Sequence, residues 1–175
     1  MSIFPRRLGF LLFVIFSSLV TPSSVLAQPL REQIIGTWTL VDWIWTFVDS
    51  GEVKAGTFGN EAFGHTIYSD DGYMCAALMR PNRSKFASKD WRGGTSDEKL
   101  AAYDGYIAYC GKFEVNEVDR TISTTVDTSL YPNWTGSIQK RYASLTGDRL
   151  TLTTPKFLIE GKEAIGTLVW QKAQK

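Results

Sequence analysis

The sequence predicts an all-β fold: an antiparallel up-and-down β-barrel of about eight strands with one short helix near residues 96–108. Three observations support this prediction. Eight short segments are rich in β-branched and aromatic residues, turn signals separate most of them, and one segment combines helical periodicity with a capping box. A single helix gives no series of βαβ units, so a parallel sheet is not expected. The 175 residues, without repeat or linker, suit one domain.

Residues 1–27 differ from the rest of the chain. Arg6 and Arg7 precede the apolar run Leu8–Val20, and Ala27 ends a polar stretch in small-x-small form. This is the layout of a secretory signal peptide cleaved after Ala27. The apolar run is shorter than the roughly 20 residues that a spanning helix needs. We therefore expect a secreted or periplasmic domain of residues 28–175, with no membrane span after cleavage.

The charge balance of the mature chain argues against charged partners. The 19 Lys and Arg, less the two in the leader, stand against 18 Asp and Glu, a net charge of −1. No basic stripe is present, so nucleic acid is not an expected partner. The single His, His65, lacks a second ligand at zinc spacing, and no phosphate-loop or dinucleotide motif occurs. The sequence predicts no metal and no cofactor.

The elements follow from local patterns taken in order. A single helical turn is expected within Gln28–Ile35, as a cap on the barrel. Thr95 and Glu98 have capping-box spacing, and the stripe of Leu100, Tyr103 and Ile107 extends the predicted helix over residues 96–108. The eight expected strands are Ile35–Phe47, His65–Tyr68, Tyr73–Met79, Tyr109–Val115, Thr121–Leu130, Gly136–Leu145, Arg149–Thr154 and Ala164–Gln171.

Two cysteines, Cys75 and Cys110, lie in consecutive predicted strands. In an oxidising compartment they could form a disulfide that closes a loop of 35 residues. The alternative is a pair of buried free thiols that pack as small apolar groups. The facing of the two strands decides between these interpretations, and the sequence leaves both open.

Several blocks of the chain resemble the lipocalin-like domain family of small bacterial and fungal proteins. Gly36-Thr37-Trp38 is similar to the first lipocalin motif. The other blocks are Ile67-Tyr68, Asp71–Met74, Leu78–Arg83, Ala101–Tyr109, Ser129–Trp134, Arg141-Tyr142 and Asp148–Leu152. The resemblance implies a calycin-type barrel for a small apolar or amphipathic ligand. In the family pattern a His often precedes the Ser129–Trp134 block, but this chain has Thr124 and Thr125 there.

The start of the first strand is expected to be structural. Gly36 opens the strand, and Trp38 packs at the closed end of the barrel with its indole N–H on a carbonyl. Arg141 or Lys172 is expected over the face of Trp38 as a cation–π lid. These assignments place any binding site at the opposite end of the barrel, where the loops lie.

Asp42 is a candidate catalytic residue. Period-two alternation places it with Trp38 and Leu40 on one strand face, and Trp43 and Trp45 on the other. If the Trp38 face points inward, Asp42 is a carboxylate inside the barrel or at its rim, able to act as a general acid or base. The plainer interpretation, which the residue type favours, is a solvated or Arg-paired carboxylate at the rim.

Candidate ligand-binding residues cluster in loops and aromatic positions. Arg80 and Arg83 flank a Pro-Asn pair, where two guanidinium groups could hold a carboxylate or phosphate, although solvation or pairing with loop carboxylates is the plainer role. Asn133 and Trp134 form a rigid turn that either caps a cavity or covers core. Tyrosines, with Tyr68 and Tyr109 among them, suit either a pocket lining or a barrel filled by its own side chains.

Three functions are consistent with these features. The first is an exported module that binds a small hydrophobic or amphipathic molecule. The second is a cofactor-free isomerase or cyclase that uses Asp42 and tyrosines, and the third is a filled barrel with a structural or interaction role. A filled interior would argue against the first two. An open apolar pocket with Asp42 at the surface would favour binding over catalysis.

Overall fold

The computed structural model describes residues 28–174, and the predicted signal peptide, residues 1–27, lies outside the described residues. Eight antiparallel strands form a closed barrel, because β1 pairs with β10 as well as with β3. In order around the barrel the strands are β1 (Gly36–Phe47), β3 (Phe63–Tyr68), β4 (Tyr73–Met79), β5 (Tyr106–Asn116), β6 (Thr121–Ser129), β7 (Ile138–Thr146), β8 (Arg149–Thr153) and β10 (Lys162–Lys172). The predicted fold class is confirmed.

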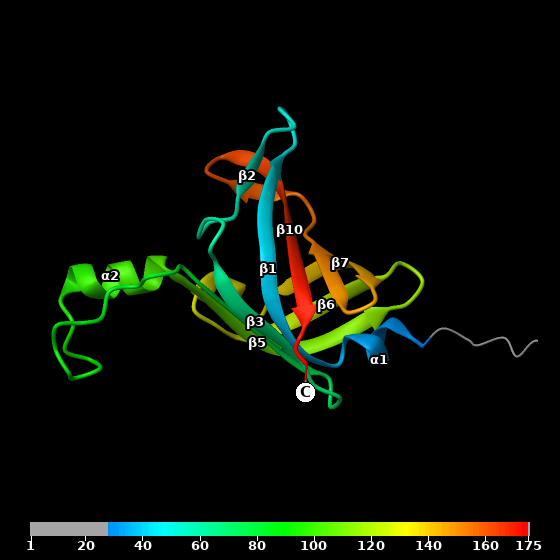
Figure 1. Ribbon diagram of the computed structural model, residues 1–175, viewed down its shortest axis with the longest axis horizontal. Helices are drawn as coiled ribbons and strands as arrows, with labels where there is room; N and C mark the ends of the chain where they lie inside the picture. The colour runs from blue at the N-terminus through cyan, green and yellow to red at the C-terminus, as the bar shows by residue number, and fades with distance from the viewer. Residues whose placement is uncertain (1–27, 175) are drawn as a thin grey trace, which may run out of the picture.

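Two three-residue strands extend the sheet at one end of the barrel. Strand β2 (Val53–Ala55) pairs with Ile44–Thr46 of β1, and β9 (Phe157–Ile159) pairs with Lys162–Ala164 of β10. Both additions stand at the top of the barrel in Figure 1, because these parts of β1 and β10 face each other in the ladder. We call this end the open end.

The opposite end, which we call the floor, is closed by helix α1 (Leu30–Ile34). Leu30 and Ile34 are buried, and the Glu117 carboxylate between β5 and β6 accepts the backbone N–H of Leu30 at 2.7 Å. Trp38 is fully buried beside them, and its indole N–H donates to the Ile34 carbonyl at 2.7 Å. Buried aromatic side chains such as this one contribute strongly to the stability of a protein core. The structure thus places Trp38 in the floor.

Lys172, not Arg141, covers the Trp38 ring. The Lys172 ammonium lies 5.2 Å from the ring centroid and donates to the Gln33 carbonyl at 2.8 Å. The cation–π contact therefore connects the end of β10 to α1 across the floor. Of the two cations considered from the sequence, Arg141 was the wrong one, because its side chain lies in the barrel interior.

Helix α2 (Ser96–Asp104) begins at the predicted capping box. Thr95 Oγ1 accepts the Glu98 N–H at 3.3 Å, and the Glu98 carboxylate accepts the Thr95 N–H at 2.7 Å. The helix ends four residues earlier than predicted, since Gly105 ends it and the backbone from Tyr106 joins the β5 ladder. It projects from the side of the barrel and buries none of its residues (Figure 1). None of the helices in residues 28–174 has the length and apolarity to cross a membrane.

Cys75 and Cys110 form a disulfide between directly opposed residues of β4 and β5. Their Cα atoms are 4.1 Å apart. Inward-facing Met74 and Ala76 flank Cys75, which is exposed, so the disulfide lies on the outer face of the sheet. Closing a loop of this length stabilises the folded state by about 4 kcal/mol in the chain-entropy account. Of the two alternatives that the sequence left open for these cysteines, the structure has the paired form.

Candidate functional site

A cavity of about 370 Å³ lies inside the barrel between the floor and the open end. The strands contribute the wall, and the segments near β2, β9 and the 3₁₀ helix η1 (Pro132–Trp134) surround the opening. Apolar side chains dominate the wall; they include Trp43, Trp45, Met74, Ala76, Leu78, Ile107, Trp134, Leu152, Phe157, Ile159, Leu168 and Trp170. The barrel is therefore not filled by its own side chains.

A β-bulge in β1 determines which of its side chains line the cavity. The register of β1 against β10 shifts between Leu40 and Asp42. Below the bulge Trp38 and Leu40 point inward, and above it Trp43 and Trp45 do, while Asp42 is exposed. The strict alternation assumed from the sequence is therefore wrong for this strand. Asp42 lies outside the barrel, where it has no access to the cavity.

Trp43 is held in the wall by close packing. A Cβ atom on Gly56 would come within 2.2 Å of the Trp43 ring, so only glycine fits at this position without moving the indole. Trp45 and Phe58 contact Trp43 edge to face, with ring centroids 5.1 and 5.5 Å away. These contacts fix a large flat apolar surface near the opening of the cavity.

Two tryptophans of the wall have indole N–H groups without a protein acceptor. Trp43 is 5% exposed and Trp170 is 2% exposed, and neither Nε1 atom has a hydrogen-bond partner in the described part of the chain. Buried polar groups of this kind are uncommon, since most find a partner in the folded protein. By contrast, Trp38 donates its indole N–H to Ile34. The unpartnered donors thus belong to the two rings that line the cavity, whereas the indole N–H of Trp38 in the floor has a backbone acceptor.

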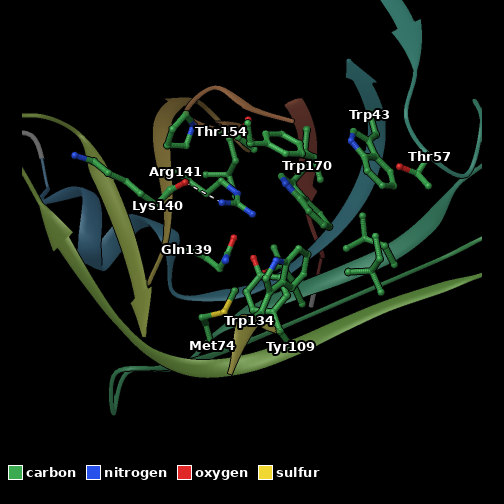
Figure 2. A pocket seen from close by; sticks show the side chains of 18 of the residues that line it. Trp43, Thr57, Met74, Tyr109, Trp134, Gln139, Lys140, Arg141, Thr154 and Trp170 are labelled. Carbon is green, nitrogen blue, oxygen red and sulfur yellow. Dashed lines mark hydrogen bonds between the residues drawn. The ribbon is translucent and has the colours of Figure 1, made fainter. Parts of the chain in front are cut away.

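Arg141 brings a positive charge into the cavity. Alternation along β7 directs Gln139 and Arg141 inward and Lys140 outward, and Figure 2 shows the Arg141 side chain beside Trp170 and Gln139. The guanidinium donates to the Lys140 carbonyl at 2.8 Å. Lys140 extends away from the cavity (Figure 2), and its ammonium lies over the Tyr142 ring.

Tyr68 and Tyr109 both line the cavity, which is the first of the two roles that the sequence left open for them. Burial raises the pKa of Tyr68 far above its usual value, and the neighbouring Tyr109 adds to the rise. The positive charge of Arg141 lowers the pKa of Tyr68 and so partly opposes the effect of burial. Tyr68 therefore remains protonated over the physiological pH range.

Trp134 also lines the cavity, on the edge nearest α2. Its ring contacts Tyr109 and Tyr131 edge to face, with centroids 5.5 and 5.7 Å away. A second hollow of about 230 Å³ continues on its other side, between β5 and the end of α2. Trp134 thus lines both spaces, together with Thr57 and Ile107.

The other predicted ligand-binding residues do not line the cavity. Arg80 lies 5.9 Å from the Phe58 centroid, and Arg83 donates to the Ala102 carbonyl of α2 at 3.0 Å; both side chains are exposed. Asn133 donates to the Tyr131 hydroxyl at 3.1 Å within its own turn. These placements give the three residues a role in holding loops, with no contact to the cavity.

Sequence reasoning missed Gln139, Trp43 and Trp170 and assigned Arg141 to the floor. Side chains alternate between the two faces along β7, so Gln139 and Arg141 share the inward face of buried Ala143. This alternation is the signal that could have placed both side chains inside. Among residues 28–174, no group of three His, Cys, Asp or Glu side chains is close enough to hold a metal ion. The site is an apolar cavity with a few hydrogen-bond donors, and its lining includes three cationic residues, Arg141, Lys140 and Lys156.

Known proteins with similar sequences agree with this architecture. The family model described as Lipocalin-like domain matches residues 35–173. The chain is 35% identical over 106 residues to the 4'-hydroxy-3'-methoxypropiophenone carrier protein ppsC of Aspergillus oryzae, a match that covers 57% of this chain and 96% of that protein. No solved structure matches the chain significantly. The family match extends over well beyond half of the sequence, and the chain belongs to the lipocalin-like domain family.

Proposed function

We propose that this protein is an exported carrier that binds a small hydrophobic or amphipathic molecule inside the barrel. The cavity is the observation that supports this function most strongly. It has a volume of about 370 Å³, an apolar wall and one open end. Ligand pockets in proteins span roughly 300–1,000 Å³, so this cavity suits a molecule of one or two rings.

The similarity to a carrier protein supports the same proposal. The relative from Aspergillus oryzae is named as a carrier of 4'-hydroxy-3'-methoxypropiophenone, a small aromatic ketone. An aromatic ring of that size suits a wall that presents Trp43, Trp134 and Trp170. We propose that the ligand of this chain is likewise a small molecule with an aromatic or aliphatic body.

The catalytic alternative has no observation in its favour. It required a carboxylate in the barrel interior, and Asp42 is exposed on the outer face of β1. No Asp or Glu is among the described side chains that line the cavity. An open apolar cavity with Asp42 at the surface favours binding.

Binding is tested by titration of the disulfide-bonded protein with N-phenyl-1-naphthylamine, a neutral probe that fluoresces in apolar surroundings. We expect saturable binding at one site per chain, and displacement by small aromatic ketones such as 4'-hydroxy-3'-methoxypropiophenone. A folded protein that gives no saturable signal with the probe, and none by calorimetry with such ketones, would contradict the proposal.

Export is the second part of the proposal. Residues 1–27 have the layout of a signal peptide, and the Cys75–Cys110 disulfide suits an oxidising compartment. When the full sequence is expressed in a host with a secretory pathway, we expect the exported protein to have the intact mass of residues 28–175 with the disulfide formed. A product that keeps residues 1–27 and stays in the cytosol would overturn this part.

A further inference from the structure

We infer that the ligand has an acidic oxygen-bearing group, a carboxylate or a group of similar acidity, on its apolar body, and that Arg141 binds this group inside the barrel. The inference rests on the proposed function and specifies the class of ligand. It starts from an imbalance of charge in the cavity. Arg141 lies in the wall, and no described side chain of the wall is a carboxylate.

Arg141 has unused hydrogen-bonding capacity. A guanidinium has five N–H donors, and only the bond to the Lys140 carbonyl engages this one. The ion pairs found among residues 28–174 are Lys54–Glu52 and Lys156–Glu163, so Arg141 has no carboxylate partner in that part of the chain. Arg141 is half-buried, and a ligand anion would supply the bidentate acceptor that its guanidinium lacks among these residues.

The neighbouring polar groups have the same bias toward donors. The indole N–H groups of Trp43 and Trp170 lack acceptors, and both rings lie in the same wall as Arg141 (Figure 2). The Tyr68 hydroxyl stays protonated, because burial raises its pKa. A wall with an excess of donors selects a ligand rich in acceptors. A carboxylate meets this need best, since its two oxygens match the two-pronged geometry of a guanidinium.

The position of Arg141 also sets the orientation of the ligand. Its side chain starts from β7, which β8 and β10 separate from the strand of Trp43, and Figure 2 shows Trp170 between Arg141 and Trp43. A molecule with its acidic group at Arg141 would then place its apolar body toward Trp43 and Leu78. The charged end and the apolar body therefore have separate, preformed contacts.

A matched pair of probes tests the inference. 1-Anilinonaphthalene-8-sulfonate has the same aromatic skeleton as N-phenyl-1-naphthylamine and adds one anionic group. We expect the wild-type protein to bind the anionic probe at least about 10-fold more tightly than the neutral one. In Arg141→Gln the affinity for the anionic probe should fall roughly 10- to 100-fold, as expected when a charged hydrogen bond is lost, and that for the neutral probe by less than about 3-fold.

Control variants separate the internal charge from surface attraction. Lys112→Gln removes a cation on the outer face of β5, outside the cavity lining, and should change neither affinity by more than about 2-fold, while Arg141→Lys should restore part of the loss. The effect of the Arg141 substitution on affinity should also persist in high salt, because ions screen a partly buried pair less than an exposed one. Circular dichroism and melting curves establish that each variant is folded.

The outcomes distinguish the two proposals. If neither probe binds the wild-type protein and calorimetry detects no binding of small aromatic ketones, the carrier function itself fails. If the neutral probe binds but Arg141→Gln leaves the affinity for the anionic probe unchanged, the carrier function stands and the inference about an acidic ligand is overturned.

Discussion

Replacing Ala76 by Phe is expected to abolish binding of N-phenyl-1-naphthylamine while the barrel remains folded. Ala76 is 4% exposed and lines the cavity from β4. A benzyl group at this position extends into the empty space, so it competes directly with the ligand. Overpacking of a filled core costs about 1–3 kcal/mol, but here the cavity provides room, and we expect a cost at the lower end of that range. Probe titration and urea unfolding measure the two effects.

Ala77→Phe is the matched control for this variant. Ala77 is the next residue on the same strand, and its side chain points to the outer face of the barrel. The same chemical change there should leave probe affinity within about 2-fold of wild type, as expected for a surface substitution. Equal binding by Ala76→Phe and Ala77→Phe would show that the probe occupies some other site.

Replacing Trp38 by Ala is expected to destabilise the protein by about 3–5 kcal/mol, the cost of a large aromatic-to-alanine change in a core. Trp38 is fully buried in the floor, and its ring contacts both α1 and Lys172. The variant also leaves the Ile34 carbonyl without its 2.7 Å hydrogen bond. Urea unfolding followed by circular dichroism gives the change in the free energy of unfolding.

Two further variants separate the contributions of Trp38. Trp38→Phe keeps an aromatic ring but removes the indole N–H. Its loss in the free energy of unfolding should therefore be smaller than that of the alanine variant, by at least about 1–2 kcal/mol. Trp91 is 83% exposed, and Trp91→Ala should change the free energy of unfolding by less than about 0.5 kcal/mol. A cost for Trp38→Ala no larger than that for Trp91→Ala would contradict the role assigned to the floor.

Alternation and turn residues predicted most of the fold. All eight barrel strands were expected within a few residues of their observed bounds, because Asp71-Gly72 and Gly147 mark tight turns between them. Strands β2 and β9 were missed, since three residues show no periodicity. Helix α2 was predicted too long because Ile107 continues the helical spacing, although it belongs to β5 and faces the cavity.

The site was less predictable than the fold, for a physical reason. The inward faces of a barrel depend on bulges, and the bulge between Leu40 and Asp42 has no signal in the sequence. Because of the bulge, residues 43–47 of β1 point to the face opposite to the one that strict alternation from Trp38 predicts. Asp42 is likewise moved to the outer face. Pairing of Cys75 with Cys110 likewise depended on the register of β4 and β5, which the long connection between them leaves open.

The central claim is that the ligand occupies the barrel cavity, and the indole N–H signals of the six tryptophans in a ¹H–¹⁵N NMR spectrum test it most directly. Single Trp→Phe variants assign the signals. On titration with N-phenyl-1-naphthylamine, the signals of Trp43 and Trp170 should shift, because these rings line the cavity and their N–H groups have no protein acceptor. The signals of Trp38 in the floor and of exposed Trp91 should stay in place. Shifts at Trp91 or Trp38, with none at Trp43 and Trp170, would contradict binding in the cavity.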